Sequence, residues 1–285
     1  MTRPYTVLDV FTAAPLRGNA LAVIADADGL DDETMLAMAR ETRLSETTFV
    51  QSATQAGADY RNRIWTIGGE LPFAGHPSLG TAVVVARARG DRSARYVQET
   101  GAGLQPVGVD LAEDGRSASA WVLQEPAVFG EEVDAAKAMA AAGLFPEDAD
   151  PTLPPQVVST GVAHLIAPVA AASVLARAAP DHVALGRLLD DLQAVVIYLA
   201  AVDADAGRAH ARGFSPAVAG GEDPATGSAA GPLCAYAAQR IATQRLEIDQ
   251  GAEMGRASRI VAEVEGDRVR VAGDVVVLID GMLSL

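Results

Sequence analysis

The sequence is poor in the side chains that bind metal ions or form covalent intermediates. Among 285 residues there is one cysteine, Cys234, so neither an intrachain disulfide nor a cysteine-rich zinc site can form. The one lysine, Lys137, lies in an alanine-rich segment typical of an exposed helix face, whereas a Schiff-base lysine needs a desolvated pocket. The four histidines form no H-x-x-x-H or H-E-x-x-H pair. We therefore expect no metal site.

Nucleotide-binding motifs and long apolar runs are also missing. The sequence has no G-x-x-x-x-G-K-[ST] loop, and Gly101-Ala-Gly103 lacks the third glycine of a dinucleotide fingerprint. We therefore expect no cofactor. Charged residues interrupt the N-terminal segment before a signal peptide or a membrane span could form. These absences favour a cytoplasmic location.

Positive charge is scarce relative to negative charge. The 22 basic and 37 acidic residues give a formal net charge of −15, which repels phosphate and argues against nucleic acid and anionic membranes as partners. Hydrophobic residues make up 49% and charged residues 21%, as in chains that fold around a core. The length allows one large domain or two ordinary ones.

Two segments, 74–86 and 224–239, contain no Asp, Glu, Lys or Arg, which predicts two helices buried on all sides. Each follows the pattern G-E-x-P-x-x-G, with copies that begin at Gly69 and Gly221, 152 residues apart. Segments typical of β-strands surround both. The repeat indicates an internal duplication into two α/β lobes, and the polar turn at 112–116 is the expected boundary.

The start of each predicted helix suits an anion. A helix N-terminus presents unpaired N–H groups and the positive end of the helix dipole, and Gly75 and Gly227 let a ligand approach the backbone. Two such starts facing one cleft could hold a small carboxylate. The alternative, two core helices that bind nothing, stays open at this point.

Four side chains could carry chemistry, and three of them lie at or just before these starts. Glu46 precedes an apolar strand, where desolvation raises a carboxyl pKa and suits it to shuttle a proton, unless it is a turn residue facing water. His76 opens the first helix, as a neutral imidazole in the site or as a core residue. Asp223 either contacts substrate or caps the second helix. Ser228 lacks a G-x-S-x-G elbow, so it is expected to donate a hydrogen bond rather than to attack.

Two motifs carry a resemblance that covers nearly the whole chain. Leu71-Pro-Phe-Ala-Gly-His-Pro77 and Glu222-Asp-Pro-Ala-Thr-Gly-Ser-Ala-Ala-Gly-Pro232 resemble the PhzF family of phenazine biosynthesis. Shorter segments agree with it, namely Leu8-Asp-Val-Phe-Thr12, Gly18-Asn19, Leu44-Ser-Glu-Thr47 and Gly251-Ala-Glu-Met-Gly255.

The resemblance implies an α+β fold like that of diaminopimelate epimerase. Two pseudo-symmetric lobes would each wrap a curled mixed sheet around one central buried helix. Residues 1–114 plus 274–285 would form the N-terminal lobe and 115–273 the C-terminal lobe, with the active site in the cleft between them. The resemblance also implies a homodimer.

The resemblance further implies roles for single residues. Glu46 would be the acid/base, and His76, Asp223 and Ser228 would complete the catalytic set. The substrate-binding residues would be Gly75, Gly227, Thr226 and Asn19. The type member isomerises trans-2,3-dihydro-3-hydroxyanthranilate without a cofactor.

The residues at the two helix starts exclude one chemistry of this fold. The epimerase uses a cysteine at each start, where this chain has His76 and Ser228. A single carboxylate then remains to move the proton, which favours a cofactor-independent isomerase acting on a small unsaturated carboxylate. The alternatives are an epimerase or lyase acting on another small amino or hydroxy acid, and a small-acid binding protein without catalysis.

Overall fold

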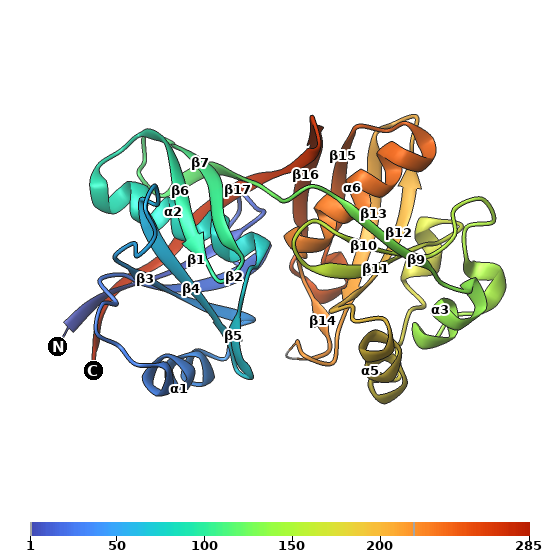
Figure 1. Ribbon diagram of the computed structural model, residues 1–285, viewed down its shortest axis with the longest axis horizontal. Coiled ribbons are helices and arrows are strands. Elements are labelled where there is room, and N and C mark those ends of the chain that lie inside the picture. The colour runs from blue at the N-terminus through green and yellow to red at the C-terminus, as the bar shows by residue number, and fades with distance from the viewer. Residues whose placement is uncertain (1, 219) are drawn as a thin grey trace. The chain divides into compact units, whose positions relative to one another are not determined.

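The computed structural model describes residues 2–218 and 220–285 (Figure 1). The chain divides into two compact units. The first unit comprises Met1–Leu123 and Ala272–Leu285, and the second comprises Gln124–Val271. The polar turn at 112–116, expected to separate the lobes, is instead a hairpin turn inside the first unit, closed by the bond from Ala112 N to Ser117 O.

The first unit is a mixed sheet closed around one helix. Its helices are α1 (Asp32–Thr42) and α2 (Gly75–Arg89), and its strands are β1 (Thr2–Val10), β2 (Asn19–Ile24), β3 (Glu46–Gln51), β4 (Tyr60–Thr66), β5 (Gly69–Leu71), β6 (Ser93–Thr100), β7 (Gly103–Leu111), β8 (Ser117–Leu123) and the end of β17 (Arg268–Ser284). Neighbouring strands follow the order β17, β1, β2, β3, β4, β6, β7, β8 and return to β17. The β2–β3 and β4–β6 pairs are parallel.

The second unit repeats this plan. Its strands are β9 (Val128–Glu132), β10 (Gln156–Ser159), β11 (Ala163–Pro168), β12 (Ile197–Asp203), β13 (Arg208–Phe214), β14 (Glu222–Asp223), β15 (Arg245–Gln250), β16 (Ser258–Glu265) and the start of β17, and its α-helices are α3 (Ala135–Ala141), α4 (Ala172–Leu175), α5 (His182–Asp191) and α6 (Gly227–Ile241). The order β9, β10, β11, β12, β13, β15, β16, β17 has its parallel pairs at β11–β12 and β13–β15, the same places as in the first unit. The predicted α+β fold, with the same architecture made twice, is confirmed.

The two central helices follow from their sequences. In α2 every residue from Gly75 to Ala86 is buried, and the helix packs against the strands of its own unit (Figure 1). Gly80 lies where an added Cβ would sit 2.5 Å from the Leu8 side chain, so glycine permits this close packing. The second central helix begins at Gly227 and not at 224 as predicted, because Glu222–Asp223 forms a short strand with β13.

The C-terminal strand also differs from its prediction. The sequence indicates two short strands at 268–271 and 275–279, separated near Gly273. The structure instead has one strand, β17, which runs from the second unit into the first without a break. Within the first unit it pairs with β1 from Thr2↔Ser284 to Val10↔Val275.

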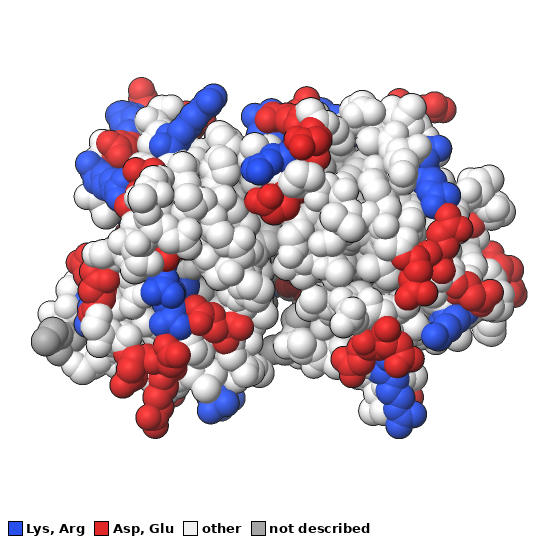
Figure 2. All heavy atoms as spheres, viewed as in Figure 1, with Lys and Arg blue, Asp and Glu red and all other residues white. Residues whose placement is uncertain are grey.

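The excess of acidic residues is visible at the surface. On the face shown in Figure 2, acidic side chains gather over α1, whose first turn carries Asp32 and Glu33 after the capping Asp31. This placement complements the positive end of the helix dipole. Within the described residues, no helix is both long enough and apolar enough to span a membrane.

Candidate active site

In the first unit the structure brings Glu46 and His76 together. Glu46 is the first residue of β3, and His76 is the second residue of α2. His76 Nε2 lies 3.1 Å from Glu46 Oε2, and the two side chains are only 5% and 14% exposed. Two residues that lie 30 positions apart in the sequence are therefore in direct contact in the folded chain.

Burial decides the charge of the histidine. It lowers the pKa of His76 from 6.5 to about 3, so the ring is neutral near pH 7. The positive end of α2 acts in the same direction. The contact with Glu46 therefore joins a carboxyl group to a neutral imidazole and is not an ion pair.

Asn19 completes this group from the start of β2. Its Nδ2 lies 3.2 Å from His76 Nδ1, and Ser45 Oγ donates to Asn19 Oδ1 at 3.4 Å. The sequence assigned Asn19 to substrate binding. The structure places it against the ring nitrogen of His76 that faces away from Glu46.

In the second unit, polar groups surround the start of α6. Thr226 Oγ1 donates to Asp223 Oδ2 at 2.8 Å, and both residues are buried. Asp223 is thus not the N-cap of α6, which is Thr226. Ser228 is the second residue of the helix and is partly exposed. These residues form a second cluster that surrounds a helix N-terminus.

Gln250 positions this cluster and was missed from the sequence. Its Nε2 donates to the Asp223 carbonyl at 2.8 Å and to Thr226 Oγ1 at 3.0 Å, while its Oε1 accepts from Thr226 N and from the Tyr198 hydroxyl. Gln250 lies at the end of β15, next to the Gly251-Ala-Glu-Met-Gly255 segment. Gly251 is required there, because its φ is +79° and a Cβ would lie 2.4 Å from the Pro224 carbonyl oxygen.

The two central helices begin differently from α1, α3 and α5. An aspartate caps each of α1, α3 and α5, with Asp31, Asp134 and Asp181 accepting from backbone N–H groups. In contrast, the described side chains form no capping bond at Ala74 or Thr226, the N-caps of α2 and α6. Neither first turn holds an acidic residue. Each start therefore offers backbone donors to an anion.

Comparing equivalent positions shows that only the first unit has this carboxylate beside a histidine. Trp65 pairs with the motif Glu70 and with Thr47, and Phe214 pairs in the same way with Glu222 and Ile197. Val196 is thus the counterpart of Glu46, and the repeat pairs His76 with Ser228. The duplicated fold holds one carboxylate at this position, not two.

Each repeat also contains an arginine clamp that the sequence did not reveal. Arg63 donates from Nε and Nη2 to both oxygens of Glu70, and Arg212 does the same to Glu222. These glutamates are the E of G-E-x-P-x-x-G. Each arginine also lies over the aromatic ring two residues later, at 5.3 Å in the first unit and 4.7 Å in the second. The motif glutamate is therefore a structural anchor ahead of each helix start.

Cys234 is a buried, protonated thiol rather than a reactive one. It is fully buried in α6, and burial raises the pKa of its thiol to about 12, so it stays protonated at neutral pH. No group of three His, Cys, Asp or Glu residues in the described part of the chain could hold a metal ion.

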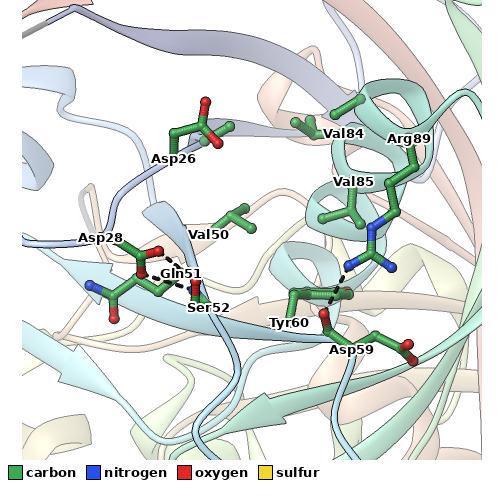
Figure 3. Close-up of a pocket in the computed structure, with 12 residues that line it drawn as sticks. Asp26, Asp28, Val50, Gln51, Ser52, Asp59, Tyr60, Val84, Val85 and Arg89 are labelled. Carbon is green, nitrogen blue, oxygen red and sulfur yellow. Dashed lines mark hydrogen bonds between the residues drawn. The ribbon is translucent and has the colours of Figure 1, made fainter.

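A separate pocket of about 320 Å³ lies at the other end of α2 (Figure 3). Two of its three acidic side chains are already engaged. Ser52 donates from N and Oγ to Asp28, which lowers the pKa of that carboxyl group, and Val97 N donates to Asp59 Oδ2 at 2.7 Å. None of the sequence-predicted site residues lines this pocket.

Comparison with known proteins agrees with the fold and the motifs. The family model described as phenazine biosynthesis-like protein, PhzC-PhzF, matches residues 8–281. The chain is 40% identical over 273 residues to a trans-2,3-dihydro-3-hydroxyanthranilate isomerase of Pseudomonas aeruginosa, covering 94% of this chain and 92% of that protein. It is 37% identical to the isomerase of that name from Pseudomonas chlororaphis, covering 99% of each chain.

Solved structures agree as well. A predicted epimerase from Pseudomonas aeruginosa superimposes with a TM-score of 0.87 at 35% identity, covering 99% of each chain. A PhzF-family protein from Bacillus anthracis gives 0.85 at 29% identity, covering 100% of each chain. A hydroxyproline epimerase from Agrobacterium vitis, 13% identical with a TM-score of 0.68, shares the fold.

The chain therefore belongs to the phenazine biosynthesis-like, PhzC-PhzF family. It is an isomerase, the activity that its curated relatives carry in their names.

Proposed function

We propose that this isomerase moves a proton within a small unsaturated carboxylate such as trans-2,3-dihydro-3-hydroxyanthranilate, with Glu46 as the single acid/base and no cofactor. The contact between Glu46 and neutral His76 is the observation that carries the proposal, since no second carboxylate occupies the equivalent position of the repeat. The names of the relatives supply the substrate class.

The proposed reaction has two proton transfers and no change in oxidation state. The Glu46 carboxylate takes a proton from a carbon beside the unsaturated bond, and the electron pair of that C–H bond spreads through the unsaturated system. The same carboxyl group then returns the proton to a different carbon. Donors aimed at the negative charge that develops lower the barrier, and the backbone N–H groups at Gly75 and Gly227 suit that task. The Asp223 carboxyl group, which accepts a hydrogen bond from the Thr226 hydroxyl, could also accept one from an amine or hydroxyl group of the substrate.

The decisive experiment follows label from heavy water into trans-2,3-dihydro-3-hydroxyanthranilate and related acids by mass spectrometry. We expect the wild type to incorporate deuterium at the carbon that receives the proton. Glu46→Gln should lower turnover by about 10²–10⁴-fold, the usual cost of losing an acid/base. The matched control is Glu41→Gln, an exposed glutamate on α1, which should retain wild-type turnover.

Near-normal turnover by Glu46→Gln would refute the proposed role of the glutamate. Deuterium appearing at the carbon that lost the proton, with inverted configuration, would indicate epimerisation. A ligand that binds with neither label uptake nor conversion to an isomer would indicate a binding protein.

The motif repeat supports a further part of the proposal, namely that one substrate engages both helix starts. Bound substrate should then slow amide exchange at both 75–78 and 227–230. Protection of only one segment would contradict a shared site. The family resemblance supports a homodimer, for which light scattering should give twice the 29.3 kDa chain mass.

A further inference from the structure

Neutral His76 carries one ring hydrogen, and each of its two nitrogens faces a different partner. Nδ1 lies 3.2 Å from the amide nitrogen of Asn19, and Nε2 lies 3.1 Å from Glu46 Oε2. The side chain is 5% exposed, so protein groups rather than bulk water decide which nitrogen holds the hydrogen.

The amide nitrogen of Asn19 can only donate hydrogen bonds. It therefore needs a lone pair on His76 Nδ1, which leaves the hydrogen on Nε2, facing the Glu46 carboxylate. In this orientation Ser45 Oγ donates to Asn19 Oδ1 at 3.4 Å.

The opposite orientation would change the protonation of the pair. With Asn19 Oδ1 against Nδ1, the hydrogen would move to Nδ1. Nε2 and Glu46 Oε2 would then be two acceptors 3.1 Å apart, an arrangement that is stable only when Glu46 is protonated.

We propose that Asn19 is a positioning residue that fixes His76 as the Nε2–H tautomer and so selects the ionised, proton-accepting form of Glu46. The catalytic meaning of this inference rests on the proposed function, whereas the tautomer does not depend on any substrate. The second unit agrees, because Val196 and Ser228 stand in place of the glutamate and the histidine, and residues 161–165, around the start of β11, include no asparagine.

Nitrogen NMR of the full chain tests the tautomer directly. In ¹⁵N-labelled wild-type protein, the His76 signals are identified by their loss in His76→Gln. We expect Nδ1 to show the downfield shift of a ring nitrogen without hydrogen, and Nε2 the upfield shift of one that carries it. Asn19→Asp replaces the donor with an acceptor, so Nδ1 should gain a hydrogen.

The matched control is Asn62→Asp, which changes another buried asparagine of the same unit, one that bonds Gln98 and not His76. It should leave the His76 signals unchanged. A hydrogen on Nδ1 in the wild type overturns the inference, even if Asn19→Asp does not fold. An unchanged tautomer in folded Asn19→Asp overturns it as well.

A kinetic measurement separates this inference from the proposed function. Asn19→Asp should lower kcat by about 10-fold or more with little change in KM, because a histidine in the wrong tautomer leaves binding groups in place. An inactive wild type with the Nε2–H tautomer would refute the proposed function and leave this inference standing. An active wild type with the hydrogen on Nδ1 would refute this inference and leave the proposed function standing.

Discussion

His164 is a buried histidine with no part in the proposed reaction. It lies on β11, is 1% exposed, and has no hydrogen-bond partner for either ring nitrogen among the described residues. Burial lowers its pKa from 6.5 to about 3. The folded protein therefore holds this ring neutral over a pH range in which an unfolded chain would protonate it.

This difference makes stability depend on pH. Stability rises with pH wherever the unfolded state binds more protons, so the free energy of unfolding should fall as pH drops from about 6.5 towards 3. His164→Leu removes that proton uptake. Between pH 7 and pH 5 the variant should lose about 2 kcal/mol less unfolding free energy than the wild type, as measured by urea denaturation. Equal losses in the two proteins would show that His164 is not held neutral.

At the scale of elements, each arginine clamp connects a long strand to the short strand that precedes a central helix, β4 to β5 and β13 to β14. Arg212 is 8% exposed, bonds both oxygens of Glu222, and also donates to the carbonyls of Leu175 and Ala178. It therefore connects the end of α4 and the residues after it to Glu222 in β14, the residue directly before Asp223. The equivalent Arg63 contacts Asp32 of α1 instead.

We predict that breaking the buried clamp costs more than removing it. Arg212→Met leaves the Glu222 carboxylate without its partner and should lower the free energy of unfolding by about 3–5 kcal/mol. The double variant Arg212→Met/Glu222→Leu removes both charges and should recover part of that loss. Urea denaturation of Arg212→Met, Glu222→Leu and the double variant measures the coupling energy between the two side chains. Strict additivity of the two losses would contradict the clamp.

The central helices could be predicted because their sequence signal is local. Thirteen consecutive residues without charge indicate a buried helix, whichever strands surround it. The clamps, by contrast, depend on contacts between residues distant in sequence. The sequence around Arg212 does not indicate its partner, because the contact with Glu222 forms only when β13 pairs with β14. Gln250 bonds residues 24 to 52 positions away, so only the folded chain reveals its role.

The candidate site was predicted only in part, because its motifs are local in sequence whereas some of its contacts are not. Glu46 and His76 stand in recognisable motifs, and the structure brings them together. Asn19 was predicted to bind substrate, but its contact with His76 Nδ1 depends on the closed sheet and could not be derived from its neighbours in sequence. The boundary at 112–116 failed because a polar turn has the same composition in a hairpin as between domains.

At the scale of the whole chain, the first unit is completed by the last residues. β17 pairs with β1 and also neighbours β8, so the closed sheet around α2 contains one strand from the C-terminus. Val275 and Val277 are buried in this sheet, and Asp280 accepts two bonds from Arg87 of α2. The second unit, Gln124–Val271, is continuous in sequence.

Removal of this strand should therefore act on the two units unequally. A chain that ends at Gly273 loses the ladder to β1 and exposes a sheet edge, so amide exchange should accelerate in β1 and β2. Exchange in β12 and β13 should change much less, because their partners all lie within the second unit. The control chain ends at Gly281 and lacks only four residues, of which Met282 and Leu285 are 63% and 47% exposed. It should keep β1 and β2 protected. If the chain ending at Gly273 instead loses protection equally in both units, they do not unfold independently and the C-terminal strand stabilises the whole chain.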